Sequence, residues 1–239
     1  MGGYFLISLF INILLVGVIY IIERHTHVIK IELIKRGVLP NEDYDKLTAD
    51  YWCRFSWTNT IEKLHIDFDI AFFGNSITRG SDFQAEFPDK RIINLGYSGD
   101  NIKGMIKRVP MIEKSKAKKV FVMACTNDLP NMSLEDFKSN FTNLITTIQD
   151  SIPGIKIYVE SILPTNHELL NRVPNDVVQK ANNIAADIAR QYNCSYIDLY
   201  SLYIDENNEL PKEFTADGIH LLPQYYNIWK EKIAPMIYE

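Results

Sequence analysis

The last histidine of the chain follows an aspartate by three residues, in the segment Asp217-Gly218-Ile219-His220. At this spacing a turn can place a carboxylate oxygen of Asp217 against Nδ1 of the imidazole, which fixes the tautomer and leaves Nε2 of His220 free to accept a proton. A hydroxyl group that gives its proton to such a base becomes an effective nucleophile. The spacing therefore predicts a hydrolase.

Ser76 is the candidate for that hydroxyl. It lies in the stretch 72–78 (FFGNSIT), where an apolar run typical of a buried strand changes into a Gly-Asn turn. Nucleophilic side chains are often held exposed at strand-to-helix turns of this kind. We therefore expect Ser76 to stand at the end of a strand, facing His220.

The composition limits the class of protein. With 239 residues, 46% hydrophobic and 23% charged, the chain can form one globular domain and a short additional segment. Its formal net charge is −5 and it has no basic block with interleaved aromatic residues, which argues against a nucleic-acid partner. Its three cysteines, Cys53, Cys125 and Cys194, form no CxxC motif, so we expect neither a disulfide framework nor a zinc site.

The additional segment is residues 4–22, which carry no charged side chain. About nineteen helical residues extend roughly 28 Å, enough to cross the hydrocarbon layer of a membrane. Met1-Gly2-Gly3 lacks the basic residues of a signal peptide, and no small-x-small cleavage site follows. The segment therefore predicts an uncleaved transmembrane anchor. A buried helix of the globular domain is the alternative.

The membrane side of the domain stays open. Basic residues follow the span and none precedes it, which by the positive-inside rule favours the cytoplasm. Enzymes of the kind inferred below are nevertheless often exported.

The remaining chain is predicted to contain a helical stalk over residues 23–64 and a catalytic domain over 65–239. Apolar runs alternate with amphipathic stretches in this domain, which indicates a parallel sheet with helices on both faces. The expected strands are 69–73, 91–95, 119–124, 156–161 and 195–199, and the expected helices are 101–114, 133–150, 174–192 and 223–237. In such open sheets ligands bind beyond the carboxyl ends of the strands.

Four segments of the domain contain the candidate nucleophile, the candidate base and glycine or asparagine residues between them. They are 74–78 (GNSIT), 94–101 (NLGYSGDN), 125–128 (CTND) and 217–221 (DGIHL). Together they resemble the SGNH (GDSL-type) hydrolase superfamily over about residues 67–237, and the second segment is similar to that of platelet-activating-factor acetylhydrolase-like members. The resemblance implies a three-layer α/β/α, flavodoxin-like domain that needs no metal or cofactor.

The resemblance also implies a role for each matching residue. Ser76 is expected to be the nucleophile, His220 the general base and then acid, and Asp217 the group that orients His220. The oxyanion hole is expected to consist of the backbone N–H groups of Ser76 and Gly99 and the side-chain amide of Asn127. These donors suit developing negative charge, because neither a backbone N–H nor a neutral amide has to change its protonation state.

Neighbouring residues receive structural roles. Asp100 is expected to be a helix N-cap, and Asp128 to hold its loop. Two positions depart from the family pattern, since Asn75 stands where an Asp is usual and Cys125 where a Gly is usual. Asn keeps the turn-forming ability of Asp. A thiol nucleophile at Cys125 would need a His partner, and the sequence indicates none.

The function implied is that of a membrane-anchored serine esterase acting on small acyl esters, foremost acetyl esters, of carbohydrate or lipid. Two alternatives remain at this point. The same nucleophile and base could serve an acyltransferase that passes the acyl group to a glycan. The chain could also be an inactive glycan- or lipid-binding module tethered to the membrane.

Overall fold

The computed structural model describes residues 15–18, 20, 61–64 and 66–239. The chain divides into two units, Met1–Cys53 and Arg54–Glu239, and nearly all the described residues belong to the second. The predicted anchor (4–22) and stalk (23–64) lie outside the described residues, apart from 15–18, 20 and 61–64. In the described part of the chain, no helix has the length and apolar character needed to cross a membrane.

A five-stranded parallel sheet forms the centre of the domain. Its strands are β1 (Ile70–Gly74), β2 (Ile92–Gly96), β3 (Lys119–Met123), β4 (Lys156–Glu160) and β5 (Ser195–Ile197). They lie in the order β2-β1-β3-β4-β5, and every neighbouring pair is parallel. Each predicted strand is present, with its ends displaced by at most two residues. The order is that of a flavodoxin-like sheet, as expected.

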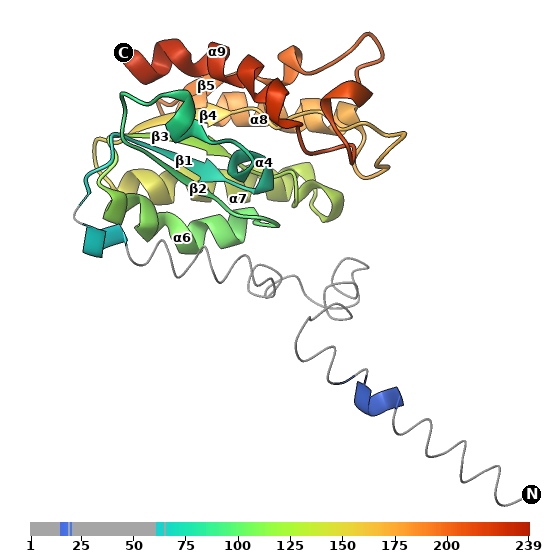
Figure 1. Cartoon of the computed structure of the whole chain (residues 1–239), viewed down its shortest axis with the longest axis horizontal. Helices are drawn as coiled ribbons and strands as arrows, with labels where there is room; N and C mark the ends of the chain where they lie inside the picture. Colours follow the sequence, from blue (N-terminus) through green and yellow to red (C-terminus); the bar gives the residue numbers. More distant parts are fainter. Residues whose placement is uncertain (1–14, 19, 21–60, 65) are drawn as a thin grey trace, which may run out of the picture. The chain divides into compact units, whose positions relative to one another are not determined.

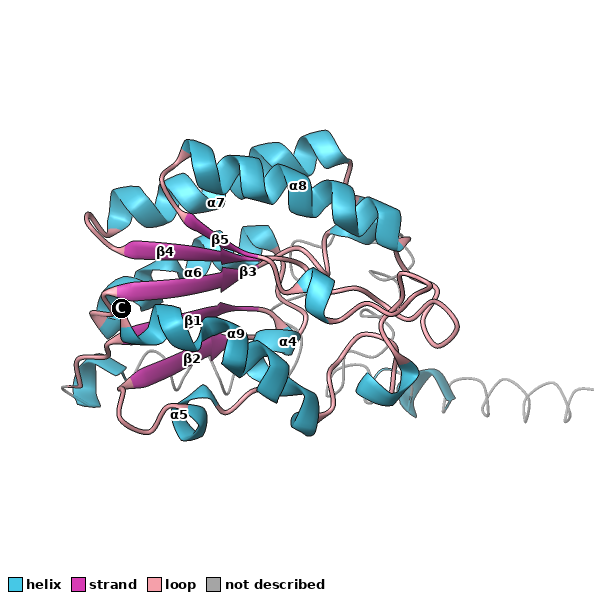
Figure 2. Ribbon diagram, turned by 90° about the horizontal axis from the view of Figure 1, so that it is seen from above, coloured by secondary structure: helices cyan, strands magenta, loops and turns pink. Residues whose placement is uncertain are grey.

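Helices cover both faces of this sheet (Figure 1). On one face lie α6 (Ile102–Ser115) and α7 (Leu134–Ser151), and α8 (Asn175–Gln191) packs beside α7 and β5. The opposite face is covered by α9 (Tyr226–Tyr238), as Figure 2 shows from above. The α/β/α layering predicted from the alternating pattern is therefore confirmed.

Alternate strand residues supply the two cores. Phe72 of β1 stacks on Phe83 at 3.6 Å and on Phe121 of β3 at 4.8 Å between ring centroids. Trp229 and Ile233 of α9 belong to the same buried cluster. The intervening residues of β1 and β3, such as Phe73 and Val122, are fully buried as well. The strands are covered on both sides, which explains their nearly continuous apolar sequences.

The helix ends follow the local sequence. Ser133 caps α7, because its Oγ accepts a hydrogen bond from the backbone N–H of Asp136 at 3.0 Å. The predicted helix from residue 223 begins as the 3₁₀ turn η6 (Pro223–Tyr225) and continues as α9. The turn η2 (Ile61–Leu64) lies at the end of the predicted helical stalk. The other short elements were not predicted, namely α4 (Ser76–Arg79), α5 (Phe83–Glu86), η3 (Leu129–Asn131), η4 (Tyr200–Leu202) and η5 (Lys212–Phe214).

Candidate active site

The topology brings three of the four predicted segments to one edge of the sheet. β1 lies between β2 and β3, so the loops that leave their carboxyl ends are neighbours. Ser76 follows β1, Gly99 follows β2 and Asn127 follows β3. The chain proceeds from β1 to one side and then to the other, and the crevice at such a switch point is where open α/β sheets bind ligands.

Ser76 occupies a tight strand-to-helix turn. β1 ends at Gly74, and Asn75 caps α4 by accepting a hydrogen bond from the N–H of Ile77 at 2.9 Å. A Cβ at Gly74 would lie 2.8 Å from the backbone carbonyl oxygen of Met123, so no larger residue fits there without a shift of the backbone. Asn75 thus preserves the turn, as expected from its likeness to Asp, and Ser76 stands as the first residue of α4.

Asp217, His220 and Ser76 form a continuous chain of hydrogen bonds. Nδ1 of His220 lies 2.6 Å from Oδ2 of Asp217, and Nε2 of His220 lies 2.8 Å from Oγ of Ser76. With Nδ1–H donating to the carboxylate, Nε2 is the nitrogen that accepts from the serine hydroxyl. Residues 144 positions apart in the sequence therefore meet in the arrangement that the Asp-x-x-His spacing predicts.

A tight turn holds the His220 side chain in place. Oδ1 of Asp217 accepts hydrogen bonds from the backbone N–H groups of His220 at 2.9 Å and Ile219 at 3.1 Å. Thr215 braces the turn, since its Oγ1 accepts from the N–H of Gly218 at 2.9 Å. Gly218 has a φ of +87°, and a Cβ there would come within 2.9 Å of the Asn166 carbonyl oxygen, so this turn requires glycine.

These hydrogen bonds set the charge of Asp217. Partial burial raises the pKa of its carboxyl group, but the hydrogen bonds from the His220 ring and from the N–H groups of His220 and Ile219 outweigh burial, and the pKa falls to about 2. Asp217 is therefore ionised throughout the neutral range and remains a hydrogen-bond acceptor for His220.

The two predicted oxyanion loops contact each other. Nδ2 of Asn127 donates to the backbone carbonyl of Asp100, the residue after Gly99, at 2.8 Å. Oδ1 of Asn127 accepts from the Arg172 guanidinium at 3.3 Å, so both ends of the amide are held. Gly99 itself has a φ of +76°, a conformation that favours glycine. The structure thus places Asn127 against the loop that contains Gly99.

Comparison with known proteins agrees with this geometry. The sequence model of the GDSL-like lipase/acylhydrolase family matches residues 72–228, a range that contains Ser76, Gly99, Asn127, Asp217 and His220. The chain belongs to this family. It is accordingly a serine hydrolase of the SGNH type, with acylhydrolase or esterase activity. No curated protein sequence is a significant match to this acylhydrolase.

Solved structures share the fold at low sequence identity. A Streptococcus pneumonia protein provisionally described as a platelet activating factor is 20% identical, with a TM-score of 0.71 over 88% of this chain and 99% of that one. A GDSL-like lipase from Bacteroides thetaiotaomicron VPI-5482 is 22% identical, with a TM-score of 0.65 over 77% and 97%. An acetyl-xylooligosaccharide esterase from Geobacillus Stearmophilus, crystallised as a mutant, is 17% identical, with a TM-score of 0.56 over 72% and 94%.

The structure corrects the predicted role of Asp100 and confirms that of Asp128 in this acylhydrolase. Asp100 is not the helix N-cap, because Asn101 caps α6 by accepting from the N–H of Gly104 at 2.8 Å. The fully buried Asp100 instead forms an ion pair with Arg108, which sequence reasoning did not single out. Asp128 accepts from the N–H of Ile102 at 3.2 Å and so holds its loop against α6, and burial raises its pKa to about 7.

Cys125 occupies a position suited to glycine. Its φ is +93°, and its carbonyl oxygen accepts from the N–H groups of Asp128 at 2.9 Å and Leu129 at 3.1 Å in a tight turn after β3. This backbone conformation accounts for the glycine that the family usually has here. Burial raises the pKa of the Cys125 thiol well above its usual value, which keeps it protonated and argues against a thiolate nucleophile.

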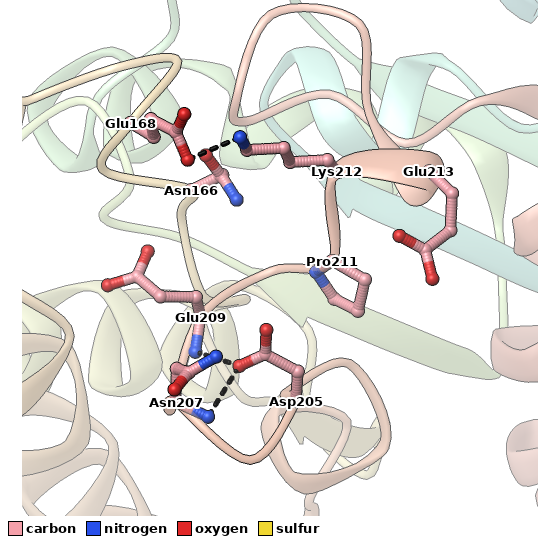
Figure 3. Close-up of a pocket in the computed structure, with 8 residues that line it drawn as sticks. All are labelled: Asn166, Glu168, Asp205, Asn207, Glu209, Pro211, Lys212 and Glu213. Atoms are coloured by element: carbon pink, nitrogen blue, oxygen red, sulfur yellow. Dashed lines mark hydrogen bonds and ion pairs between the residues drawn. The ribbon is translucent and has the colours of Figure 1, made fainter.

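The loops after β4 and β5 enclose a polar pocket of about 490 Å³ (Figure 3). It is lined by Asn166, Glu168, Asp205, Asn207, Glu209, Pro211, Lys212 and Glu213. Its connection to the site runs through Asn166, whose N–H donates to the Gly218 carbonyl oxygen at 2.8 Å. Ser76 and His220 are not among its lining residues. Within the described residues, no group of three or more His, Cys, Asp or Glu side chains could hold a metal ion.

Proposed function

We propose that this acylhydrolase is a membrane-anchored esterase that removes short acyl groups, foremost acetyl groups, from carbohydrate esters through an acyl-Ser76 intermediate. The observation that supports this most is the hydrogen-bonded series from Asp217 through His220 to Ser76 at the switch point of the sheet. In this series Ser76 is suited to be the nucleophile, His220 to be the general base and then acid, and Asp217 to orient His220.

In the first half of the reaction, Oγ of Ser76 attacks the ester carbonyl carbon while Nε2 of His220 takes the hydroxyl proton. The developing imidazolium is stabilised by the ionised Asp217. His220 then gives the proton to the alcohol oxygen as the ester bond breaks, which leaves the acyl group on Ser76. In the second half, a water molecule takes the place of the serine hydroxyl, and the acid product and free Ser76 result.

The negative charge on the former carbonyl oxygen requires fixed hydrogen-bond donors. We assign this role to the N–H groups of Ser76 and Gly99 and to Nδ2 of Asn127. The loops that carry these residues leave neighbouring strands, and Asn127 already contacts the Gly99 loop through the Asp100 carbonyl. Donors that are fixed before the reaction stabilise the transition state without a further reorganisation cost.

The polar pocket favours a carbohydrate over a lipid as the alcohol part of the substrate. Carboxylate and amide groups line it, and these groups bind hydroxyls by hydrogen bonds, whereas an alkyl chain would desolvate them at a cost. The acetyl-xylooligosaccharide esterase of the same fold is named for an ester of this kind. The resemblance of segment 94–101 to platelet-activating-factor acetylhydrolase-like enzymes supports a short acyl group.

An ester panel on the full-length protein in detergent tests this assignment. We expect turnover of acetyl esters to exceed that of octanoyl esters, and acetylated xylo-oligosaccharides to release acetate. Preferred cleavage of long-chain lipid esters would contradict the proposed substrate. Transfer of the acetyl group to an added sugar, in place of release into water, would identify an acyltransferase.

The proposed anchor rests on residues 4–22, whose length and lack of charge suit a single membrane span. We expect the full chain to remain with membranes during an alkaline carbonate wash, because a spanning helix is held far more firmly than a peripheral one. A mature protein that begins after residue 22 would contradict an uncleaved anchor. Protease treatment of intact cells would then establish the side, for which the basic residues after the span favour the cytoplasm.

A further inference from the structure

Arg108 and Asp100 form an ion pair that is withdrawn from solvent. The Arg108 side chain is 1% exposed, and that of Asp100 is not exposed at all. Both groups lose their hydration in such a place, and apolar residues of similar size often stabilise a protein as well or better. Stability alone therefore gives little reason for this pair, and its contacts indicate what else it does.

The guanidinium group joins three backbone segments at the carboxyl edge of the sheet. Nε donates to Oδ2 of Asp100 at 2.8 Å, and Nη2 contacts the same oxygen. Nη1 donates to the Leu95 carbonyl oxygen in β2 at 3.1 Å, and Nη2 donates to the Gly74 carbonyl oxygen at the end of β1 at 3.4 Å. One planar group thus fixes the ends of β1 and β2 relative to the loop that contains Asp100.

Aromatic rings hold this plane from the side. The guanidinium carbon lies 3.9 Å from the ring centroid of Tyr97 and 4.7 Å from that of Phe73. Both distances are within the range of a cation–π interaction, which favours arginine over lysine at such a site. Tyr97 is also tied to β1, because its N–H donates to the Gly74 carbonyl oxygen at 3.0 Å.

Asp100 extends the same connections to the third loop. Its backbone carbonyl accepts from Nδ2 of Asn127 at 2.8 Å, while its Oδ1 accepts from the N–H of Asn101 at 3.1 Å. The ion pair is therefore linked to each expected oxyanion donor: Ser76 lies two residues after Gly74, Gly99 precedes Asp100, and Asn127 bonds to Asp100 directly.

We propose that the Arg108–Asp100 pair is a positioning device that sets the Ser76, Gly99 and Asn127 donors at the mutual spacing an oxyanion requires. The inference rests on the proposed function, because it assigns a purpose to the oxyanion donors of that reaction. Donors must lie about 2.7 to 3.1 Å from the oxyanion, and an error of about 1 Å can cost about 10²-fold in rate. Lysine lacks the planar fork that reaches Leu95, Gly74 and Asp100 together.

The test compares Arg108→Lys and Asp100→Asn with a control pair that also joins β1 and β2. Arg91 and Asp69 make an exposed ion pair of 3.1 Å directly before the amino-terminal ends of β2 and β1, so Arg91→Lys is the matched control. We expect kcat per folded molecule to fall about 10- to 100-fold in Arg108→Lys and Asp100→Asn, with KM changed by less than about twofold. The rate of phosphonylation by a fluorophosphonate should fall in parallel, and Arg91→Lys should leave both unchanged.

The outcomes separate this inference from the proposed function. If the wild-type protein neither turns over esters nor reacts with the fluorophosphonate, the proposed function is wrong. If the wild type is active and both variants fold with wild-type kcat, only the positioning role is wrong. If neither variant folds, as judged by circular dichroism and thermal unfolding, the pair serves folding and the inference is likewise overturned. A rise confined to KM would assign the pair to substrate binding instead.

Discussion

The ionised carboxyl group of Asp217 can only accept hydrogen bonds from His220 and cannot donate one to it. Its pKa of about 2 keeps it ionised at neutral pH, and it accepts from both the ring and the backbone N–H of His220. An asparagine at this position could present an NH₂ group to Nδ1, which would leave a proton on Nε2 where Ser76 needs a base.

We therefore expect Asp217→Asn to lower kcat by up to about 10⁴-fold at neutral pH, through loss of the correct tautomer. Initial rates between pH 6 and 9 would measure this, since Asp217 does not titrate in that range. Asp187→Asn, an exposed substitution on α8, is the control and should keep wild-type rates. If Asp217→Asn keeps the wild-type kcat, Asp217 does not orient His220 for catalysis and only stabilises its loop.

Asn127 offers a different test, because its amide is expected to act mainly in the transition state. Asn127→Ala removes the donor, and Asn127→Asp keeps the shape but replaces the NH₂ group with an acceptor. Both changes should lower kcat by about 10² to 10³-fold, or roughly 2.7 to 4 kcal/mol. Steady-state kinetics would check this, and an effect on KM alone would mean that Asn127 only binds substrate.

At the scale of elements, the loop after β3 contains the clearest conflict between residue and conformation. Cys125 is buried with a φ of +93°, whereas alanine or cysteine in a left-handed conformation costs about 1 to 2 kcal/mol relative to glycine. We expect Cys125→Gly to be more stable than Cys125→Ala by about 1 kcal/mol, the reverse of the usual order. Urea unfolding of both variants would measure this difference.

The neighbouring Ala124 provides the control for that comparison. It is also buried but has no positive φ, so Ala124→Gly should destabilise the protein in the ordinary way. If Cys125→Gly proves less stable than Cys125→Ala, the strain inferred from the backbone is absent.

The elements of the domain could largely be predicted from the sequence, because its strands are short apolar runs and its long helices are amphipathic. The four-residue helix α4 could not, since a single turn carries no periodic pattern. The structural role of Arg108 could not be predicted for another reason. Arg108 lies on the buried face of α6 with Met105 and Ile112, where a charged residue weakens the apolar periodicity. A charged side chain at an apolar helix position was the available signal, although its partner Asp100 was not evident from spacing.

The candidate catalytic residues Asp217 and His220 were recognisable from the sequence because they are close together in it. The turn from Asp217 to His220 is local, so its hydrogen bonds follow from the sequence spacing. The contact of His220 with Ser76 is not local. It was expected because Ser76 follows an apolar strand at a turn suited to a nucleophile, and because both residues match positions of the SGNH family. The position of the polar pocket depends on how the loops after β4 and β5 meet, which no local pattern specifies.

At the scale of the whole molecule, Glu160 joins the sheet to α9 through a buried carboxyl group. Oε1 accepts from Nε1 of Trp229 at 2.6 Å, while Oε2 has no hydrogen-bond partner among the described residues. Burial raises the pKa of Glu160 to about 8, and the Trp229 hydrogen bond only partly opposes this effect. Folding therefore favours the protonated form.

The sign of the pH effect follows from this. Above its unfolded pKa of about 4.5 the carboxyl group is ionised in the unfolded chain but still protonated in the folded one, so stability falls as pH rises towards about 8. This group should cost on the order of 1 kcal/mol per pH unit in that window. Glu160→Gln should flatten the slope of unfolding free energy against pH between 5 and 8, whereas the exposed Glu113→Gln should not. Equal slopes in all three proteins would contradict the raised pKa.

The central claim is that one serine, activated by His220, carries the acyl group. Its most direct test is the reaction of the full-length protein with a fluorophosphonate, followed by peptide mass spectrometry. We predict a single phosphonyl adduct, on Ser76. The Ser76→Ala variant should form no adduct, its ester turnover should be lower by at least about 10⁴-fold, and its thermal unfolding should match that of the wild type. An adduct on another residue, or near wild-type turnover in Ser76→Ala, would contradict the account.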